Sequence, residues 1–432
     1  MARWHDMIYG GGLKRYGGNT LWMAAEKFCR LLVMFFVGIY VANKLGPENM
    51  GGFSYALSVV MLVGVLVDFG MDGVIVRELV RTPERQGVIL GSAFRLKLLG
   101  YAVMVLFIGI FIGIKGLSYI NGVIIILTLG YGFHTLWAME GLFKAKVCAS
   151  YLSISQIIAM LMFALLRIIV VKNSDNLYLL ASCEIVQEAV MVAGFLYFYR
   201  HGKLPRLKWQ WQSDTAKHLL KESWPLAAAA AATQIYMRTD QLFITKIVGE
   251  SANGCFSVAA RFVEAGYFIP LVICSSGFPA IVSVHGVDKP LYNFRIRALF
   301  SSLIWCGMLM ATGMIMLSPW LINTLLPKYQ SSIQIIQIMS LNMIIVYFGV
   351  ARGYWLLAEG LQRYNLLFMG CGVAVSLVMN SLLVPHWGIY GAAWTAIATQ
   401  IAVNLLSPLL IPATRKSTVM FFQAIIGYGL KK

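Results

Sequence analysis

Two segments of the sequence carry opposite charges among apolar neighbours. Arg238 and Asp240 follow the alanine run 227–232, and Arg261 and Glu264 come further along the chain. A charged side chain at the centre of a membrane helix costs about 2.5–3.5 kcal/mol on insertion scales. We therefore expect these four side chains to face water, a ligand or each other, and not lipid.

Arginines within apolar segments suit an anionic ligand. A guanidinium group donates two parallel hydrogen bonds to a phosphate and keeps its charge when it is buried. Several such groups favour a large phosphate-bearing anion, whereas a small hydrophobic cation would be bound by acids and aromatic rings. The candidate substrate-binding residues are Arg30, Arg238, Arg261 and Arg352.

Acidic residues in the same segments could couple transport to an ion. Ionisable groups inside a membrane often mark the path of a proton, an ion or a substrate. Either H⁺ or Na⁺ would serve at a carboxylate. The candidate ion-coupling residues are Glu26, Asp240, Glu264 and Asp68.

Direct pairing is the alternative role for these charges. Arg238 could pair with Glu264, and Asp240 with Arg261, so that the charges only join neighbouring helices. Apolar packing usually replaces a buried ion pair without loss of stability, which argues against a purely structural role. The sequence leaves both roles open.

Other charges in apolar segments have simpler expected roles. Glu26 and Arg30 lie four residues apart, on one face of a helix. Arg167, Glu184 and Glu188 lie on consecutive apolar segments and could pair with one another.

Two further basic residues and one histidine also lie within predicted spans. Arg95 and Lys97 would snorkel to the cytoplasmic interface. His134 is expected to be part of a hydrogen-bonded structure more than a proton relay.

The elements that position these residues are membrane-spanning helices. Of the 432 residues, 59% are hydrophobic and 12% are charged, and the mean hydropathy is +0.74. Uncharged runs such as 298–327 exceed the roughly 20 residues that a helix needs to cross a bilayer, and they lack the short alternating pattern of a barrel. The predicted spans are 20–43, 53–72, 92–114, 117–139, 148–171, 177–199, 221–247, 254–282, 297–325, 331–357, 363–385 and 388–412.

The net charge of +17 is explained by topology and not by nucleic-acid binding. With the N-terminus in the cytoplasm, 22 of the 35 Lys and Arg residues fall on the cytoplasmic side, five fall on the other side and eight lie within spans. Cytoplasmic loops carry such an excess of Lys and Arg. We therefore predict that both termini are cytoplasmic and that no signal peptide is removed.

An internal repeat divides the chain. The segments 46–56 and 249–259 share five of eleven residues at a shift of 203, and each follows the first span of its half. Because each half holds six spans, the two halves are predicted to have parallel orientation, related by an axis along the membrane normal. The predicted regions are an N-terminal six-helix bundle (1–205, with its cytoplasmic N-terminal segment), a cytoplasmic linker (206–220), a C-terminal six-helix bundle (221–412) and a cytoplasmic tail (413–432).

Glycine and proline mark turns and a bend. Gly46 and Gly249 are expected in turns, where a positive φ or close packing favours glycine. Pro270 lies within the span 254–282 and should kink it.

The sequence lacks the motifs of several enzyme classes. It contains no GxxxxGK[ST] loop, no HExxH and no paired cysteines, so we expect no ATP hydrolysis, metal site or cofactor. The outward loops are too short for a catalytic domain. We expect a transporter without catalytic residues.

Four stretches resemble polysaccharide flippases of the Wzx type. These belong to the multidrug/oligosaccharidyl-lipid/polysaccharide (MOP) exporter superfamily, with the multidrug and toxin extrusion (MATE) exporters and the lipid II flippases. The resemblance covers nearly the whole chain. The stretches are 43–78 (NKLGPENMGGFSYALSVVMLVGVLVDFGMDGVIVRE), 223–264 (SWPLAAAAAATQIYMRTDQLFITKIVGESANGCFSVAARFVE), 326–344 (LPKYQSSIQIIQIMSLNMI) and 379–400 (MNSLLVPHWGIYGAAWTAIATQ).

The resemblance implies a fold and a function. The fold would be all-α, with twelve transmembrane helices in two six-helix bundles that form a MATE-like V around a cationic cavity. The function would be to move undecaprenyl-pyrophosphate-linked O-antigen or related oligosaccharide units from the cytoplasmic to the periplasmic leaflet of the bacterial inner membrane by alternating access. Spans one, two, seven and eight line the cavity in relatives. Implied partners are membrane lipids, H⁺ or Na⁺, and polysaccharide polymerase and chain-length proteins.

Two other functions fit the sequence less well. A cation-coupled multidrug exporter of the same fold would not need the arginines in the spans. A membrane glycan polymerase or ligase would need a large outward loop.

Overall fold

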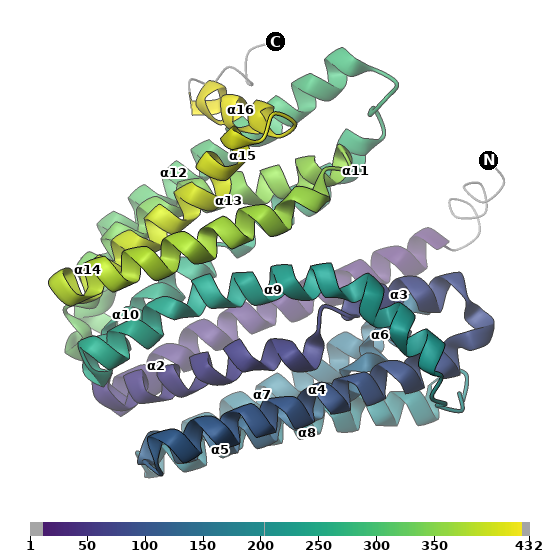
Figure 1. Cartoon of the computed structure of the whole chain (residues 1–432). Coiled ribbons are helices and arrows are strands. Elements are labelled where there is room, and N and C mark those ends of the chain that lie inside the picture. The colour runs from purple at the N-terminus through teal and green to yellow at the C-terminus, as the bar shows by residue number, and fades with distance from the viewer. Residues whose placement is uncertain (1–11, 203, 426–432) are drawn as a thin grey trace. The chain divides into compact units, whose positions relative to one another are not determined.

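The computed structural model describes residues 12–202 and 204–425, and all regular structure in this part of the chain is helical (Figure 1). The predicted N-terminal segment before residue 12, Lys203 of the linker and the end of the predicted tail after residue 425 lie outside the described residues. The longer helices are α2 (Gly12–Asp68), α3 (Asp72–Arg81), α4 (Gln86–Lys115), α5 (Tyr119–Tyr131), α6 (Ala138–Ala145), α7 (Ala149–Asn173), α8 (Leu177–His201), α9 (Ser213–Ile247), α10 (Glu250–Ala265), α11 (Phe268–Val282), α12 (Lys289–Leu325), α13 (Ser332–Ala358), α14 (Asn365–Ile401) and α16 (Arg415–Ile425).

Shorter helical pieces join some of these helices. A 3-10 helix, η2 (Gly132–Trp137), links α5 to α6, and a π-helical turn, η5 (Ala402–Leu406), continues α14. The remaining short pieces are η1 (Pro83–Arg85), η3 (Pro327–Tyr329), η4 (Gln362–Tyr364) and α15 (Ser407–Leu410).

Nine helical stretches among the described residues are long and apolar enough to cross a membrane. Two of them, Ala25–Arg81 and Gln362–Leu410, contain a glycine with non-helical φ and ψ, so each comprises more than one helix. α9 is 35 residues long and is not among the nine. Together these observations are consistent with the twelve predicted spans.

Glycine ends the first helix of each half, as predicted. Gly46 has φ 76° and ψ 171°, and Gly249, at the equivalent repeat position, has φ 119° and ψ 171°. L-residues rarely adopt positive φ, whereas glycine does so freely. The next residue opens a new helix. In the first half this residue is Pro47, whose missing N–H costs nothing in a first helical turn.

The helix predicted to bend at Pro270 is broken one turn earlier. α10 ends at Ala265 and α11 begins at Phe268, which puts Pro270 in the first turn of the new helix. Because proline cannot donate a backbone hydrogen bond, it fits a first turn, whereas inside a helix it removes a bond and bends or breaks the helix. The expected kink is therefore confirmed as a complete break.

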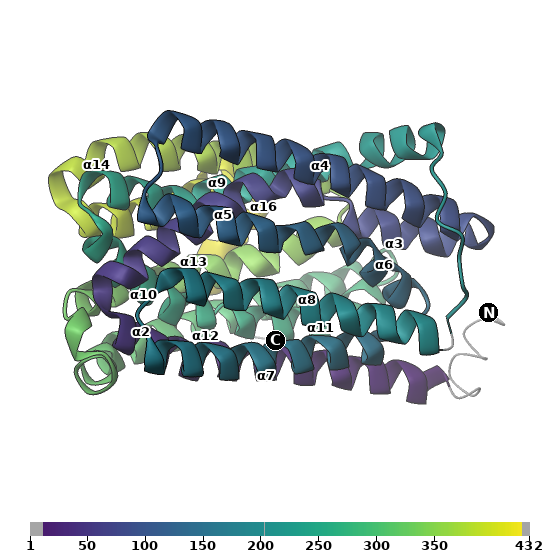
Figure 2. The same ribbon diagram turned by 90° about the horizontal axis from the view of Figure 1, so that it is seen from below.

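The described chain forms two compact units. The first contains residues 59–230 together with the part of α2 up to Lys44, and the second contains residues 45–58 and 231 onward. α2 and α9 therefore contribute residues to both units. In the first unit α7 and α8 lie side by side and α5 packs on α8, as both views show (Figures 1 and 2). In the second unit the closest neighbours are α12 and α13.

The segment predicted as a linker packs on the first unit. The backbone N–H of Gln210 donates a hydrogen bond to the Gly87 carbonyl at 3.2 Å. A Cβ built on Gly91 would lie 2.4 Å from the Gln210 carbonyl oxygen, so only glycine permits this approach. Trp209 and Leu219 join the apolar core beneath α3 and α4.

Apolar side chains also cover much of the outside of the helices. The exposed ones include Ile114, Leu309, Met316 and Leu410. A soluble protein rarely exposes so many large apolar side chains, whereas a membrane protein presents them to lipid. The surface therefore agrees with the hydropathy of the sequence.

Candidate functional site

A polar pocket lies inside the second unit, between α9, α10, α13 and α14. It holds about 460 Å³ of empty space, which is too small for several sugars but sufficient for an ion with its water. Two acidic residues in its lining, Asp240 and Glu264, make it a candidate ion site. Its polar lining residues are Tyr236, Asp240, Gln241, Glu264, Tyr267, Asn342, Thr399 and Gln400.

Asp240 is held by an amide of another helix. The side chain is only 5% exposed, and its Oδ1 accepts a hydrogen bond from Asn380 Nδ2 of α14 at 2.6 Å. Asn380 Nδ2 also donates to the Ser376 carbonyl at 3.0 Å. Asn380 therefore provides the polar contact that a buried carboxylate requires.

Several oxygen atoms near this carboxylate lack a hydrogen-bond donor. Asn380 Oδ1, Asn342 Oδ1 and Thr399 Oγ1 are buried and have no partner among the described residues. An unsatisfied buried acceptor costs about 1–3 kcal/mol. Oxygen atoms of this kind, together with a carboxylate, are the ligands that hard cations prefer.

The two arginines of α9 and α10 lie near Glu264. Glu264 is within electrostatic range of both Arg238 and Arg261, and it is also near Asp240. Arg238 forms no ion pair within 4 Å among the described residues, and its buried Nε has no hydrogen-bond acceptor. The direct pair between Arg238 and Glu264, which the sequence left open as an alternative, is therefore not formed.

Arg352 lies in a different environment from the other candidate arginines. It is 2% exposed, and its Nη1 donates to the carbonyl oxygens of Val403 at 2.7 Å and Asn404 at 3.3 Å. Its guanidinium also stacks on Phe368, 4.8 Å from the ring centre. A π-helical turn leaves carbonyl groups outside the regular bonding pattern, and Arg352 binds two of them.

Two pairs in the first unit follow the expected pattern. Arg30 and Glu26, one helical turn apart, form an ion pair at 2.6 Å, with the Arg30 side chain 49% exposed. Arg167 Nη2 and Glu184 Oε1, on α7 and α8, are 2.7 Å apart. The third member of that predicted group, Glu188, instead accepts a hydrogen bond from Trp137 Nε1 at 3.3 Å.

The prediction that Lys97 snorkels to the interface is wrong. Its side chain is fully buried, and its Nζ lies 3.1 Å from both Asp68 Oδ1 and Asp72 Oδ1. A buried ammonium group is expensive unless it is paired, and two carboxylates pair it here. Asp68 therefore belongs to a polar network that the sequence did not indicate.

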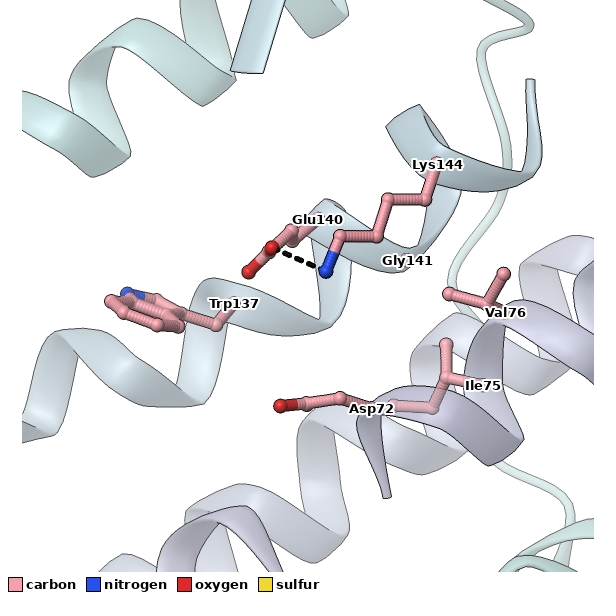
Figure 3. Close-up of a pocket in the computed structure, with 7 residues that line it drawn as sticks. All are labelled: Asp72, Ile75, Val76, Trp137, Glu140, Gly141 and Lys144. Atoms are coloured by element: carbon pink, nitrogen blue, oxygen red, sulfur yellow. Dashed lines mark ion pairs between the residues drawn. The ribbon is translucent and has the colours of Figure 1, made fainter. Parts of the chain in front are cut away.

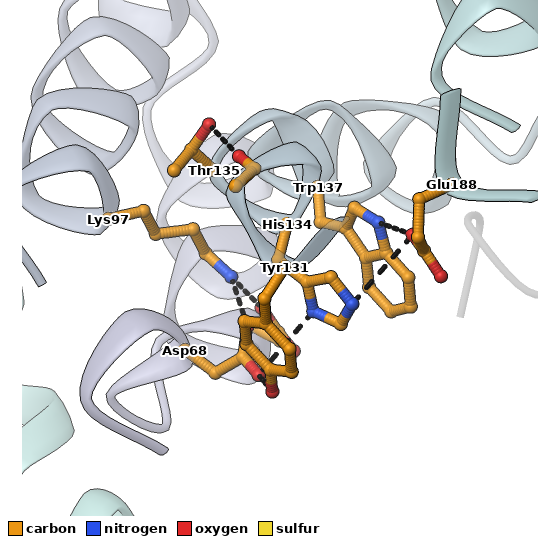
Figure 4. A network of polar contacts seen from close by, with 9 residues as sticks. Asp68, Lys97, Tyr131, His134, Thr135, Trp137 and Glu188 are labelled. Carbon is orange, nitrogen blue, oxygen red and sulfur yellow. Dashed lines mark hydrogen bonds and ion pairs between the residues drawn. The ribbon is translucent and has the colours of Figure 1, made fainter. Parts of the chain in front are cut away.

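Three aromatic rings of this network are stacked (Figure 4). They stack because the α-helix α5 continues as the 3-10 helix η2, which has three residues per turn. Tyr131, His134 and Trp137 are three residues apart, and in a 3-10 helix such as η2 side chains at this spacing are aligned. The His134 ring lies 4.0 Å from the Tyr131 ring and 4.2 Å from the Trp137 ring, nearly parallel to both. The Tyr131 hydroxyl donates to Asp68 Oδ2 at 3.2 Å.

A small pocket between α3 and α6 adjoins the network (Figure 3). Asp72 and Trp137 line it, and both also contact members of the network. At its rim Lys144 pairs with Glu140 at 2.6 Å, the interaction dashed in the figure.

The candidate residues therefore fall into separate groups. Asp240 and Glu264 line one pocket, Glu26 and Arg30 form a pair, Asp68 lies in the network, and Arg352 binds backbone. The sequence analysis did not identify the uncharged partners of these residues, because it started from the charged residues. Uncharged polar residues inside the predicted spans could have revealed Asn342 and Asn380, whereas His134 was named from the sequence without its two carboxylate neighbours.

The family described as "Polysaccharide biosynthesis protein" matches residues 17–285 of the chain. A protein of Shigella dysenteriae that is named for O-antigen transport is 23% identical over 402 residues, which cover 90% of this chain and 98% of that protein.

Solved transporter structures share the fold. An inward-facing MATE family multidrug resistance transporter of the MOP superfamily has a TM-score of 0.73 and 14% identity, covering 90% of this chain and 96% of that one. The lipid II flippase MurJ in an inward closed conformation has a TM-score of 0.72 and 15% identity, covering 94% of this chain and 91% of that one. The predicted all-helical, MATE-like fold is thereby confirmed.

Proposed function

The chain belongs to the polysaccharide biosynthesis protein family, and from this premise we propose that it is a flippase for lipid-linked oligosaccharides. Its substrate would be an undecaprenyl-pyrophosphate-linked O-antigen or related repeat unit. The glycan and pyrophosphate would cross from the cytoplasmic to the periplasmic leaflet while the lipid tail stays in the bilayer. The similarity to the Shigella protein and the fold shared with MurJ support this proposal.

The environment of Arg238 is the main support for the proposal. Arg238 lies on α9, it has no ion-pair partner within 4 Å among the described residues, and its buried Nε lacks an acceptor there. An unused guanidinium donor is a ready partner for a pyrophosphate oxygen. Arg261, on α10 and near the same Glu264, would add a second cation. Arg30, which is half-exposed, would act from the first unit.

Ion coupling would take place in the pocket of the second unit. Within the described part of the chain, Asn380 is the one hydrogen-bond donor to Asp240, and the side-chain oxygens of Asn342 and Thr399 in the same pocket have no partner. Binding H⁺ or Na⁺ there would neutralise a buried charge that is otherwise costly. Glu264 lines the same pocket and lies near the arginines, so its charge would link ion binding to substrate binding. Glu26 and Asp68 remain candidates in the first unit.

We further propose a topology and regions for the transport cycle. Both termini would be cytoplasmic in the bacterial inner membrane, with bundles over 1–205 and 221–412 joined by a linker at 206–220 and followed by a tail at 413–432. The bundles would form a V around a cationic cavity that opens alternately to each side. Polymerase and chain-length proteins would use the delivered unit.

Complementation of a deletion strain tests the proposal. Loss of the gene should abolish surface glycan and leave lipid-linked units in the inner leaflet. The double variant Arg238→Ala, Arg261→Ala should fail to restore surface glycan at equal protein abundance. The control Arg206→Ala removes an exposed cation of the linker and should restore it fully.

Three results would overturn the proposal. Normal surface glycan in the double variant would indicate a scaffold that does not transport. Drug resistance on overexpression, with unchanged glycan, would indicate a multidrug exporter. Accumulation of single repeat units in the periplasmic leaflet would indicate a polymerase or ligase.

A further inference from the structure

We propose that His134 is a proton-binding site of the first unit, and that its protonation joins α2 to α8 through Asp68 and Glu188. The site is separate from the Asp240 pocket, which lies in the second unit. The proposal concerns proton binding itself. It does not require that the transported molecule be a glycolipid.

The two ring nitrogens of His134 point to carboxylates on different helices (Figure 4). Nδ1 is 3.9 Å from Asp68 Oδ2 of α2, and Nε2 is 3.7 Å from Glu188 Oε2 of α8. Both distances are longer than a hydrogen bond. Nδ1 is buried and has no hydrogen-bond partner among the described residues. A small ring movement would bring either nitrogen within bonding distance of its carboxylate.

The protonation state of His134 decides how many carboxylates the ring can donate hydrogen bonds to. A neutral imidazole has one N–H and can donate to only one of the two, whereas an imidazolium has two and can donate to both. The stacked Tyr131 and Trp137 rings on either side limit the ring to this plane. The bridge between α2 and α8 is therefore complete only when His134 is charged.

The charge around His134 favours a proton. Lys97 pairs with Asp68 and Asp72, and Glu188 lies on the other side of the His134 ring, so the network around His134 holds three negative charges and one positive charge. Two outer groups near Glu188, Arg30 and Glu184, are already paired with Glu26 and Arg167. The Tyr131 hydroxyl and the Trp137 N–H add donors but no charge. A neutral His134 leaves two uncompensated negative charges, and a charged one leaves a single charge.

The network is partly exposed on one side. The Asp68 and Asp72 side chains are 32% and 58% exposed, and the pocket between α3 and α6 borders the network (Figure 3). Glu140 and Lys144, which also line this pocket, lie on α6 in a segment that the distribution of Lys and Arg predicts to be cytoplasmic. The proton would therefore arrive from the cytoplasmic side: an O–H bond of hydronium breaks, an N–H bond forms on His134, and water remains.

The test is a histidine titration of the whole protein in lipid nanodiscs. The protein is labelled with ¹³C at histidine Cε1, and His134→Gln identifies the His134 signal among the six histidines. The signal is followed between about pH 8 and 5, and we expect it to report protonation of His134. Glu188→Gln and Asp68→Asn each remove one neighbouring negative charge and should each shift the midpoint of this change. Both variants retain the imidazole, so they decide the question even if His134→Gln folds poorly.

Glu140→Gln is the matched control. It removes a carboxylate near Trp137 that is already paired with Lys144, and it should leave the His134 midpoint unchanged. A His134 signal that does not titrate in this range overturns the proposal, as does a midpoint that is unaffected by both Glu188→Gln and Asp68→Asn. The titration contains no glycolipid, so its failure would not bear on the flippase proposal, nor would failure of the flippase proposal alter it.

Discussion

Ser54 donates a hydrogen bond to Ser257 at 3.0 Å, and the two residues are equivalents, 203 positions apart, in the two copies of the internal repeat. The surrounding contacts are reciprocal. A Cβ on Gly51 would meet the Glu250 carbonyl oxygen at 1.7 Å, and a Cβ on its equivalent Gly254 would meet the Pro47 carbonyl oxygen at 1.9 Å. Since Pro47 and Glu250 are also 203 apart, the two helix beginnings cross about a local two-fold axis. The two copies of the repeated segment therefore contact each other at equivalent positions within the second unit.

Alanine at either crossing glycine should be destabilising. Gly51→Ala forces apart two backbones that are in direct contact, and such overpacking costs about 1–3 kcal/mol. We expect a lower unfolding temperature in detergent for Gly51→Ala and for Gly254→Ala. The combined variant should cost less than the sum of the two, because one separation of the helices relieves both clashes.

Gly38→Ala is the control for this pair. Gly38 lies in α2 before the break at Gly46, and a Cβ there would have no neighbour within 4 Å. Alanine should therefore be neutral or stabilising by up to about 1 kcal/mol. Equal unfolding temperatures for Gly38→Ala and Gly51→Ala would contradict the close crossing.

The sequence indicated the helices, the repeat and the local pairs, but not the partners across helices. Hydropathy and glycine position are local properties, so Gly46, Gly249 and the break near Pro270 were predictable. The pair of Asp240 with Asn380 joins residues 140 positions apart, and no spacing rule relates them. Lys97 was misplaced because snorkelling considers one helix, whereas its carboxylate partners come from the end of α2 and from α3.

Lys97 should be important for stability. Lys97→Met leaves Asp68 and Asp72 without their cation. Breaking a fully buried pair costs about 3–5 kcal/mol, and the loss here should be smaller because the Asp72 side chain is 58% exposed. We expect a clear fall in unfolding temperature in detergent. Lys144→Met removes the more exposed pair with Glu140 and should cost less than about 1 kcal/mol. A larger loss for Lys144→Met than for Lys97→Met would contradict this ranking.

Asn380 should be required for ion coupling. Asn380→Leu removes the donor to the buried Asp240 carboxylate, which would then hold a proton more tightly or fail to bind Na⁺. In proteoliposomes, transport by this variant should lose its dependence on an imposed H⁺ or Na⁺ gradient. Ser381→Ala changes an exposed neighbour on the same helix and should keep that dependence. Gradient-dependent transport in Asn380→Leu would exclude this pocket as the coupling site.

Substitution of Arg352 and of Arg238 should separate a structural arginine from one that binds substrate. Arg352→Met leaves the Asn404 carbonyl oxygen without the guanidinium donor, and the Val403 carbonyl oxygen with only the Ser407 hydroxyl at 3.1 Å. A buried unsatisfied group costs about 1–3 kcal/mol. We expect lower protein abundance and a lower unfolding temperature, with normal transport per folded molecule. Arg238→Ala should give the opposite result, with normal abundance and impaired transport, because its Nε has no acceptor to lose among the described residues.

Arg363→Met is the control for both variants. Arg363 is exposed, and its hydrogen bond and its ring contact among the described residues are with Tyr364, so the substitution should change neither quantity. Transport and abundance measured on the same three variants therefore separate the two roles, and reduced transport per folded molecule in Arg352→Met would return Arg352 to the substrate-binding group.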